Sequence, residues 1–372
     1  MKKIAISINT SWNIYNFRLG LIKALQKEGF EVYAIAPKDD YSEKLEKLGV
    51  KHINIFMNNK GTNPIEDIKT IWEYYKIYKQ IKPDVALHYT IKPNIYGTIG
   101  AKLAGVKVIN NIAGLGTLFI NEKFATKIAK YLYKYSQKKA DKIFFQNRDD
   151  FELFVKEKLI EKNKCDILPG SGVDIEKFKP IKVNKQDNVF RFLLIARMLW
   201  DKGVGEYVEA AKVIKQKCKN VEFLLLGAAG VDNPTAIPKE TIEKWEKEGI
   251  VKYLGTSDDV KSEIAKADCI VLPSYYREGV PRTLLEAAAM EKPIITTNNI
   301  GCKEVVDDGI NGYLCNVKDS KDLADKMVKM LKLSEEERIK MGKAGREKII
   351  KEFDERIVIE KYLKAIKEVM SS

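Results

Sequence analysis

The sequence predicts an α/β protein built from two doubly wound parallel sheets, each with its own hydrophobic core. The chain has 372 residues, more than the roughly 250–300 residues over which one core usually extends. Short apolar runs alternate with longer amphipathic ones, which is the rhythm of βαβ units. This rhythm stops at a polar stretch, residues 180–188, and then restarts. Such a break is typical of a linker between two domains.

The first half, residues 1–180, is expected to form one domain. Its apolar runs are short and nearly continuous, as in strands that are covered on both faces. Amphipathic helical periodicity lies between them, at residues 17–27 and 64–82. The expected strands are residues 3–9, 31–36, 84–88, 106–111 and 141–146.

The second half, residues 181–354, is expected to form a similar domain. The expected strands are residues 190–197, 221–227, 251–254, 269–272 and 293–297, with helices at 204–217, 239–247, 281–290 and 320–331. A helical segment follows from residue 334, and its last part, about residues 355–372, is expected to pack back on the first domain. Ligands of such sheets bind beyond the carboxyl ends of the strands, so the two domains are expected to face a cleft.

Composition excludes several classes of protein. Hydrophobic residues make up 45% and charged residues 31% of the chain, which is the profile of a soluble globular protein. No apolar run reaches the roughly 18 residues of a membrane span, and the apolar N-terminal stretch is too short for a signal peptide. The five cysteines lie far apart and the chain has only two histidines. A disulfide framework and a histidine-rich metal site are therefore not expected, and a cytoplasmic location fits.

Positive charge is concentrated in the first half. The formal net charge is +13; residues 1–180 hold 31 Lys and Arg against 20 Asp and Glu, whereas the rest holds 34 against 32. Such a surface suits nucleic acid, an anionic membrane or a phosphorylated substrate. The lysines lack interleaved base-stacking aromatics and no nucleic-acid-binding motif is present, so we do not expect a nucleic-acid partner. A generally lysine-rich surface without a partner is the alternative interpretation.

Two cations follow the first strand of the second half. Arg197 ends the strand, and Lys202 follows five residues later, directly before a glycine. Cations at a strand exit suit a diphosphate, since one contact at about 4 Å contributes about 4 kcal/mol at an effective dielectric near 20. Stabilising a departing diphosphate by that amount would accelerate a reaction about a thousandfold. The alternative is a solvated turn with two surface cations.

A second motif follows the strand at residues 269–272. The loop after it contains Glu278 and Gly279, and Pro281 suits the first turn of the next helix. Free N–H groups at such a helix start form an anion site. Glu286, in the second turn, is placed to accept hydrogen bonds from ribose hydroxyls. The alternative is that Glu286 is a helix-face carboxylate and that Glu278 is favoured by the helix dipole.

Two glutamates with seven residues between them, after a strand and before a helix, resemble the donor motif of glycosyltransferase family 4. Arg197 and Lys202 match that family's diphosphate-binding pair. The resemblance implies a two-domain GT-B fold, a UDP-sugar donor, retention of anomeric configuration and no metal or other cofactor. The last implication agrees with the lack of an Asp-x-Asp motif after an apolar strand.

The resemblance also implies roles for individual residues. Arg197, Lys202 and Glu278 would be catalytic, the first two on the diphosphate and Glu278 on the donor sugar, while Glu286 would bind the ribose. The other residues expected to help seat the sugar, the phosphate and the base are Gly279, Thr283, Gly255 and Thr256.

Residues 196–204 and 276–281 resemble enzymes of bacterial surface-glycan assembly, among them N-acetylgalactosaminyltransferases that extend undecaprenyl-diphosphate-linked sugars in N-glycan synthesis. This likeness implies transfer of an N-acetylhexosamine such as GalNAc from a UDP-sugar to a polyprenyl-diphosphate-linked saccharide. It also implies a peripheral position at the inner face of the cell membrane. Two alternatives stay open: a UDP-sugar 2-epimerase of the same fold, and a non-catalytic nucleotide-sugar-binding module.

The acceptor is expected in the first half. Arg18 lies after the first strand and is placed to meet an acceptor phosphate, with a surface salt bridge as the alternative. His88 ends another strand and either faces the cleft or is a hydrogen-bonded core histidine. Glycines after the strand at 106–111 let the backbone approach a sugar, although the histidine that many family members carry in this loop is missing. The residues expected to contact the acceptor are Asn16, Arg18, His88, Lys92, Gly114 and Gly116.

One helix of the first half is expected to meet the membrane. Lysines recur at intervals of three or four along residues 122–142, which places them on one side of a helix. Such a helix can lie on an anionic bilayer; the alternative is a surface helix packed on the sheet by its apolar stripe. The membrane lysines are Lys123, Lys127, Lys130 and Lys134, with Lys138 continuing the row, and the stripe is Phe124, Ile128, Leu132 and Tyr135.

Overall fold

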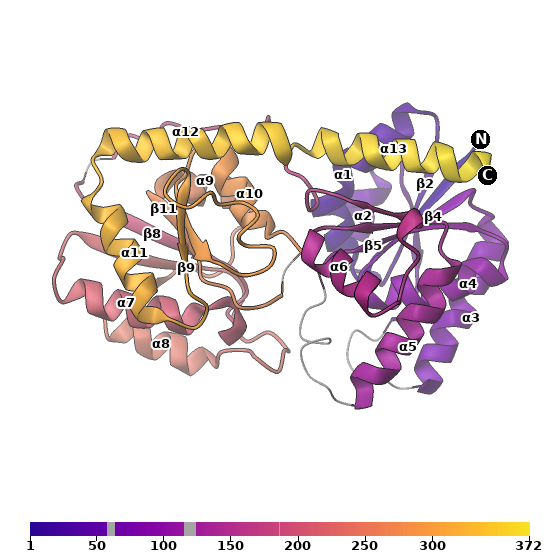
Figure 1. Cartoon of the computed structure of the whole chain (residues 1–372), viewed down its shortest axis with the longest axis horizontal. Helices are drawn as coiled ribbons and strands as arrows, with labels where there is room; N and C mark the ends of the chain where they lie inside the picture. The colour runs from indigo at the N-terminus through magenta and orange to yellow at the C-terminus, as the bar shows by residue number, and fades with distance from the viewer. Residues whose placement is uncertain (58–63, 115–123, 186, 278) are drawn as a thin grey trace. The chain divides into compact units, whose positions relative to one another are not determined.

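The computed structural model describes residues 1–57, 64–114, 124–185, 187–277 and 279–372. The chain forms two compact units (Figure 1): unit 1 is Met1–Ser171 with Glu355–Ser372, and unit 2 is Gly172–Asp354. Unit 2 thus begins before the polar stretch at residue 180. The reason is that Val173 donates its N–H to the Phe353 carbonyl at 2.9 Å, and Ile175 and Phe178 are buried in the core of unit 2.

Unit 1 contains a parallel sheet of seven strands in the order β3-β2-β1-β4-β5-β6-β7. The two edge strands, β3 and β7, were not predicted, because both are short and only partly buried. The strands are β1 (Lys3–Ser7), β2 (Glu31–Ala36), β3 (Lys51–Asn54), β4 (Val85–Tyr89), β5 (Lys107–Ile112), β6 (Lys142–Phe145) and β7 (Cys165–Ile167).

Helices cover both faces of this sheet, as the alternation of side chains along β1 requires. Ile4 and Ile6 pack on the side of α1 (Ser11–Lys27) and α13 (Glu355–Ser371), whereas Ala5 packs on the opposite side. The last helix therefore lies beside the first, as Figure 1 shows. The remaining helices are α2 (Ser42–Glu46), α3 (Pro64–Ile81), the π-helical turn η1 (Pro93–Gly97), α4 (Thr98–Leu103), α5 (Phe124–Lys139), α6 (Arg148–Lys156) and the 3₁₀ turn η2 (Lys162–Lys164).

Unit 2 contains a parallel sheet of six strands in the order β10-β9-β8-β11-β12-β13. Its strands are β8 (Phe190–Ile195), β9 (Val221–Leu226), β10 (Lys252–Tyr253), β11 (Cys269–Leu272), β12 (Ile294–Thr297) and β13 (Gly312–Cys315). Its helices are α7 (Val204–Lys215), α8 (Lys239–Lys247), α9 (Val260–Lys266), α10 (Arg282–Ala289), α11 (Ser320–Lys332) and α12 (Glu335–Glu352), with the 3₁₀ turn η3 (Trp200–Lys202) after β8. Helices α7, α8 and α11 pack on one face, and α9 and α10 on the other.

The predicted fold class, with two doubly wound parallel sheets, is confirmed. In both sheets the first strand of the unit pairs with the second and the fourth, so the winding reverses between them. Ligands of doubly wound sheets bind at this switch point, beyond the carboxyl ends of the two strands. It lies beyond β1 and β4 in unit 1, and beyond β8 and β11 in unit 2.

Candidate active site

The turn after β8 lies directly against the loop after β11. Arg197 is exposed just beyond the strand, and Lys202 is the last residue of η3. Gly203 follows with φ +75°, and a Cβ at this position would lie 2.1 Å from the Pro273 carbonyl oxygen. No side chain fits there, so glycine is required for the two segments to approach so closely.

A single carbonyl oxygen holds these two segments together. The Asp201 oxygen accepts the N–H groups of Tyr275 at 3.0 Å and of Tyr276 at 2.9 Å. The Ser274 hydroxyl donates to the same oxygen at 3.3 Å. The Lys202 ammonium lies 5.1 Å from the centre of the Tyr276 ring, which is a cation–π distance. The predicted diphosphate cation and the predicted donor loop are therefore neighbours.

Side chains from β12 and the segment after it fix the same loop from the other side. Asn299 donates its side-chain N–H to the Tyr276 carbonyl at 3.0 Å, and the Thr297 hydroxyl donates to the Ser274 carbonyl. Sequence reasoning missed Asp201, Ser274 and Asn299. Their signal is weak, because all three acceptors are backbone carbonyls that any residue could supply.

Helix α10 carries the predicted ribose carboxylate. Glu286 accepts from Arg282 Nε at 3.0 Å, and both side chains are largely buried. Burial raises the pKa of Glu286, and the positive charge of Arg282 opposes this shift. Thr283 is half-buried in the first turn, and Gly279 is buried just upstream of the helix. Glu278 lies outside the described residues.

A cavity of about 360 Å³ opens at the carboxyl ends of β9 and β10. The Gly227 N–H donates to the Gly255 carbonyl at 2.7 Å, and the Tyr253 hydroxyl donates to the Gly227 carbonyl at 2.8 Å. The Met198 N–H donates to the Ala228 carbonyl at 2.9 Å, which ties this cavity to the turn after β8. The lining residues are Ala228, Ala229, Lys239, Ile242, Glu243, Tyr253, Gly255 and Thr256, so the two residues expected near the base do line a pocket.

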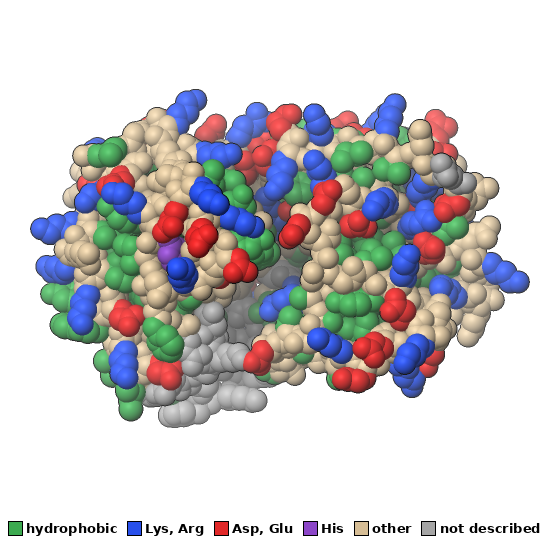
Figure 2. Space-filling model, turned by 180° about the vertical axis from the view of Figure 1, so that it is seen from behind, with side chains coloured by type: hydrophobic (Ala, Val, Ile, Leu, Met, Phe, Trp, Pro, Cys, Tyr) green, Lys and Arg blue, Asp and Glu red, His purple; other side chains and the backbone are tan. Residues whose placement is uncertain are grey.

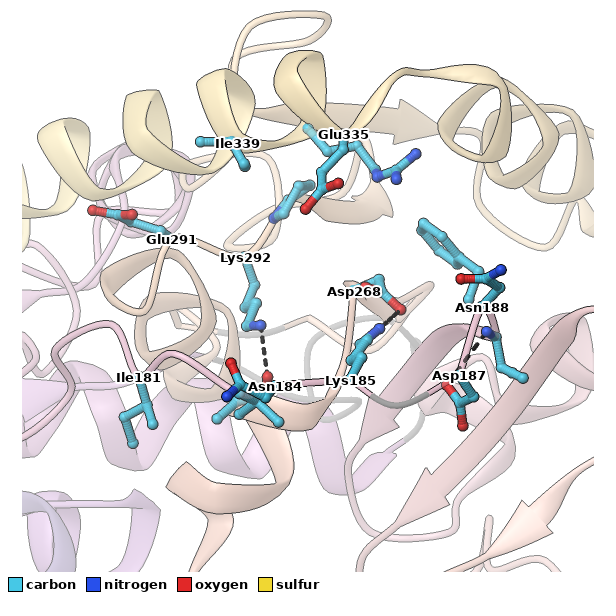
Figure 3. Close-up of a pocket in the computed structure, with 16 residues that line it drawn as sticks. Ile181, Asn184, Lys185, Asp187, Asn188, Asp268, Glu291, Lys292, Glu335 and Ile339 are labelled. Carbon is cyan, nitrogen blue, oxygen red and sulfur yellow. Dashed lines mark hydrogen bonds and ion pairs between the residues drawn. The ribbon is translucent and has the colours of Figure 1, made fainter.

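A larger cavity of about 710 Å³ lies at the opposite edge of the same sheet (Figure 3). Most of its lining residues precede or begin β8, β11 and β12, and the others belong to α9 and α12, so it lies at the amino ends of these strands and away from the switch point. Two of its cations are already engaged. Lys185 pairs with Asp268, and Lys292 donates to the carbonyls of Ala265 at 2.8 Å and Ala267 at 2.7 Å. This cavity therefore lies away from the residues that are predicted to bind the donor.

In unit 1 the structure corrects the predicted acceptor contact of His88. The imidazole is completely buried. Its Nε2 lies 2.7 Å from the Tyr78 hydroxyl, and its Nδ1 lies 3.1 Å from Asn110 Oδ1. Burial lowers the pKa of His88 to about 3, so the ring is neutral. His88 is the hydrogen-bonded core histidine of the alternative interpretation, because no part of the ring is accessible to a ligand.

Arg18 is not part of a surface salt bridge. Only 7% of it is exposed, and its guanidinium carbon lies 4.2 Å from the centre of the Tyr89 ring. Two other predicted acceptor residues have partners within the protein. Asn16 donates to the Trp12 carbonyl at 2.9 Å, and Lys92 pairs with Asp67 at 3.1 Å.

Gly114 lies just after β5 with φ +101°, a conformation that glycine readily adopts. The positions of Gly116 and Lys123 lie outside the described residues, and so does the side chain of Lys127.

The alternative interpretation of α5, a surface helix packed on the sheet by the predicted apolar stripe, does not hold for most of the described stripe residues. Its buried side chains include Tyr133, Ser136 and Gln137, whereas Ile128 and Tyr135 of the predicted stripe are exposed. Leu132, a third member of that stripe, is packed partly against the core. On the basic side, Lys130 pairs with Glu157 at 3.2 Å, and Lys134 and Lys138 are exposed. The helix therefore presents apolar as well as basic side chains to solvent.

Two family models match the chain. Residues 3–147 match the model described as "Glycosyl transferase 4-like", and residues 175–348 match "Glycosyl transferases group 1". A curated relative from Campylobacter jejuni is 31% identical over 376 residues, 97% of each chain; it is the N,N'-diacetylbacillosaminyl-diphospho-undecaprenol alpha-1,3-N-acetylgalactosaminyltransferase. A second, from Escherichia coli, is 28% identical over 72% of this chain and 71% of its own; it is the UDP-Gal:alpha-D-GlcNAc-diphosphoundecaprenol alpha-1,3-galactosyltransferase.

Solved structures share the fold. A glycosyltransferase from Rickettsia africae has a TM-score of 0.80 at 20% identity, covering 99% of this chain and 98% of its own. Anabaena HepE in complex with UDP-glucose has a TM-score of 0.80 at 17% identity over the whole of both chains. The relatives are named as glycosyltransferases rather than as epimerases or binding modules. The chain therefore belongs to glycosyltransferase family 4 and is a glycosyltransferase enzyme of the GT-B fold.

Proposed function

We propose that this enzyme transfers an N-acetylhexosamine such as GalNAc from a UDP-sugar to a polyprenyl-diphosphate-linked saccharide, with retention of anomeric configuration. The observation that carries this proposal is the 31% identity over 97% of both chains to an N-acetylgalactosaminyltransferase whose name specifies a diphospho-undecaprenol acceptor. The second relative uses a different sugar on another diphosphoundecaprenol acceptor. The lipid-diphosphate acceptor is thus common to both names, while the sugars differ.

The site in unit 2 supports a nucleotide-diphosphate donor. Arg197 and Lys202 lie beyond β8 at the switch point, where phosphates bind in doubly wound sheets. The cavity at Gly255 and Thr256 has room for a base, and Ile242 and Tyr253 give it apolar walls. Glu286 lies in the second turn of α10, after the loop that Asp201 holds. Glu278 keeps its proposed contact with the donor sugar on the strength of the family motif.

In the proposed reaction, the bond between the anomeric carbon and the β-phosphate oxygen of UDP breaks, and the acceptor oxygen bonds to the same face of that carbon. The acceptor hydroxyl proton passes to a β-phosphate oxygen of the departing UDP, so no protein nucleophile is needed. Arg197 and Lys202 stabilise the negative charge that develops on UDP. Exclusion of water from the closed site limits hydrolysis of the donor. We propose that the reaction needs no metal ion.

The test is a donor screen with a short-chain prenyl-diphosphate-linked sugar as acceptor. UDP-GalNAc, UDP-GlcNAc, UDP-Gal and UDP-Glc are supplied one at a time, and the anomer of the product is read by NMR. We expect an α-linked product from an N-acetylated donor, and unchanged turnover in EDTA. Transfer to the free sugar as fast as to the lipid-linked one, or a β-linked product, would contradict the proposal.

We also propose that unit 1 binds an anionic membrane, where a polyprenyl-linked acceptor resides. No helix in the described parts of the chain is long and apolar enough to cross a bilayer, so contact would be peripheral. On α5, Tyr131 is 69% exposed and Tyr135 is 46% exposed, next to the exposed Lys134 and Lys138. Tyrosine and lysine together are typical of helices that lie at a membrane interface.

Helix α3 adds a second apolar face. Ile68 and Trp72 are 66% and 53% exposed, and Lys76 lies 5.7 Å from the centre of the Trp72 ring. Both α3 and α5 contact α4 on the same side of the sheet. Figure 2 shows hydrophobic side chains among Lys and Arg on the surface of this unit, at the left of the view. Exposed tryptophan and isoleucine at helical spacing are unusual on a surface that meets only water.

The test is co-sedimentation with vesicles of phosphatidylglycerol and phosphatidylcholine. Each lysine near an anionic surface contributes about 1 kcal/mol, so Lys134→Glu with Lys138→Glu should weaken binding about 30-fold or more. Lys247→Glu with Lys321→Glu, on unit 2, is the matched control and should leave binding unchanged. Equal binding by both double variants, or equal binding to pure phosphatidylcholine, would refute the membrane proposal.

A further inference from the structure

A buried positive charge in unit 1 has no ion-pair partner among the residues that the structure describes. Arginine side chains carry a positive charge in proteins, yet only 7% of Arg18 is exposed. Its NH1 group donates to the Phe17 carbonyl at 3.0 Å, and its Nε has no hydrogen-bond partner. No carboxylate of the described chain forms an ion pair with it. Its contacts in the described chain are a backbone carbonyl and an aromatic ring. A buried charge without a counter-ion is unfavourable, so this position favours an anionic ligand.

The position of this charge points to a ligand rather than to a packing defect. Arg18 belongs to α1, the helix that follows β1, and its guanidinium lies over Tyr89, the last residue of β4. Strands β1 and β4 pair with each other where the winding of the sheet reverses. The unpaired charge thus lies at the switch point of unit 1, where doubly wound sheets bind ligands.

A second, independent feature is found at the residue that follows Tyr89. Thr90 directly follows Tyr89 and has φ +64°, a conformation that is rare for a β-branched residue and marks stored strain. Its hydroxyl oxygen is buried and has no hydrogen-bond partner. The residue whose ring the guanidinium covers is thus followed directly by a residue with an unused hydroxyl donor. This combination suits the oxygen atoms of a phosphate group.

We propose that Arg18 and Thr90 bind the diphosphate of the polyprenyl-linked acceptor, an inference that rests on the proposed function. The Arg18 N–H groups contact the phosphate oxygens, and the Thr90 hydroxyl donates to the same group. The rings of Tyr89 and Tyr362 lie 6.0 Å apart at this site and exclude water, which strengthens the contact. The acceptor would thereby be recognised through its anion as well as through its sugar.

The experiment is isothermal titration calorimetry of the full chain with farnesyl diphosphate, without any UDP-sugar. We expect Arg18→Met to weaken binding at least about 30-fold, because a charge-assisted contact in a buried site is lost. Arg148→Met is the matched control, since Arg148 is an arginine of the same unit that is exposed on α6; its affinity should equal that of the wild type. Inorganic diphosphate should compete with farnesyl diphosphate, and farnesol should not bind detectably.

Stability gives a second readout. Arg18→Met removes a buried charge that has no counter-ion in the described chain, so its Tm should equal or exceed that of the wild type. If Arg18 had only a structural role, the same substitution should lower Tm. Thr90→Gly removes both the strain and the hydroxyl, so it should raise Tm and weaken farnesyl diphosphate binding. If Arg18→Met does not fold, Arg18→Lys keeps the charge without the planar fork and should weaken binding about tenfold.

Three results would overturn the inference: wild-type affinity for farnesyl diphosphate in the Arg18 variants, equal binding of farnesol, or no binding of farnesyl diphosphate by the wild type. A loss of UDP affinity in Arg18→Met in place of farnesyl diphosphate affinity would assign the anion to the donor and would also overturn it. The proposed function fails differently. If farnesyl diphosphate binds through Arg18 but no sugar is transferred to lipid, the transferase proposal is wrong and the anion site stands.

Discussion

Replacing Gly203 with alanine tests whether the close approach of the two loops in unit 2 builds the donor site. Gly203 has φ +75°, and a Cβ there would lie 2.1 Å from the Pro273 oxygen and 2.6 Å from the Pro273 carbonyl carbon. These are backbone atoms, so no side-chain rotation relieves the clash. The turn that carries Lys202 must move away from the loop that carries Tyr276.

The size of the effect follows from two contributions. Alanine in the left-handed region costs about 1–2 kcal/mol, and inserting a methyl group into a closely packed contact costs about 1–3 kcal/mol more. Gly249→Ala is the matched control, since Gly249 has φ +69° in the same unit but no atom within 4 Å of its Cβ position. Gly249→Ala therefore measures the left-handed cost alone. Gly203→Ala should be less stable than this control by about 1–3 kcal/mol, or roughly 2–12 °C in Tm for a unit of this size.

Function should separate the two variants more clearly than stability. In Gly203→Ala the Asp201 carbonyl loses its bonds to the loop, so UDP affinity measured by calorimetry should fall about tenfold or more. Gly249→Ala should bind UDP like the wild type. If both variants have the same Tm and the same UDP affinity, the contact between the two loops does not build the site, and the reasoning is refuted.

Two further predictions concern the cations and the core. Arg197→Ala and Lys202→Ala should each lower kcat about 100-fold or more, because each removes charge stabilisation of the departing UDP. Lys247→Ala, on the surface, is the control and should leave kcat unchanged. Near-normal turnover in both Arg197→Ala and Lys202→Ala would refute the proposed mechanism. His88 is buried, and burial lowers its pKa to about 3. In the unfolded chain a histidine has a pKa near 6.5, so the unfolded state binds more protons than the folded state. The free energy of unfolding therefore falls as the pH drops below 6.5. This linkage amounts to about 2 kcal/mol between pH 7 and pH 5, measured by urea unfolding. His88→Gln should make the free energy of unfolding depend less on pH. A smaller dependence should remain from His52, because burial also lowers its pKa. If the pH dependence of stability is unchanged in His88→Gln, His88 is not the group responsible.

The sequence was sufficient for the central strands and insufficient for the edges. Strands such as β1 and β4 are continuous apolar runs because both faces of the sheet are covered. The edge strand β3 reads Lys-His-Ile-Asn and is only partly buried, so its pairing depends on β2 rather than on its own composition. At β13, a Cβ on Gly312 would lie 2.1 Å from the Ile294 oxygen, so the pairing depends on a close backbone contact that no sequence pattern reveals.

In the candidate site, too, some features could be predicted from the sequence and others could not. Charged side chains at strand exits, such as Arg197 and Lys202, were found because their chemistry is visible in the sequence. The pairing of Arg282 with Glu286 follows from i, i+4 spacing on a helix, and this signal was available but not used. The Asp201 carbonyl could not be found, because a backbone acceptor carries no residue signature.

His88 and Arg18 show why burial has to be known before a polar residue is assigned a role. His88 lies in β4 and Arg18 in α1, and both were predicted to contact the acceptor. His88 has partners for both ring nitrogens, so its burial is satisfied within the protein and needs no ligand. Arg18 is almost as buried and lacks an ion-pair partner in the described chain. Buried polar groups in folded proteins are ordinarily satisfied, and departures from local rules concentrate at functional sites. The strained Thr90 directly follows Tyr89, whose ring the Arg18 guanidinium covers at the switch point of unit 1. The crowded Gly203 lies at the switch point of unit 2. Crowded glycines also lie away from the switch points, as Gly312 in β13 does, so crowding alone does not mark a substrate site. The buried charge of Arg18, which has no ion-pair partner in the described chain, is the feature that does.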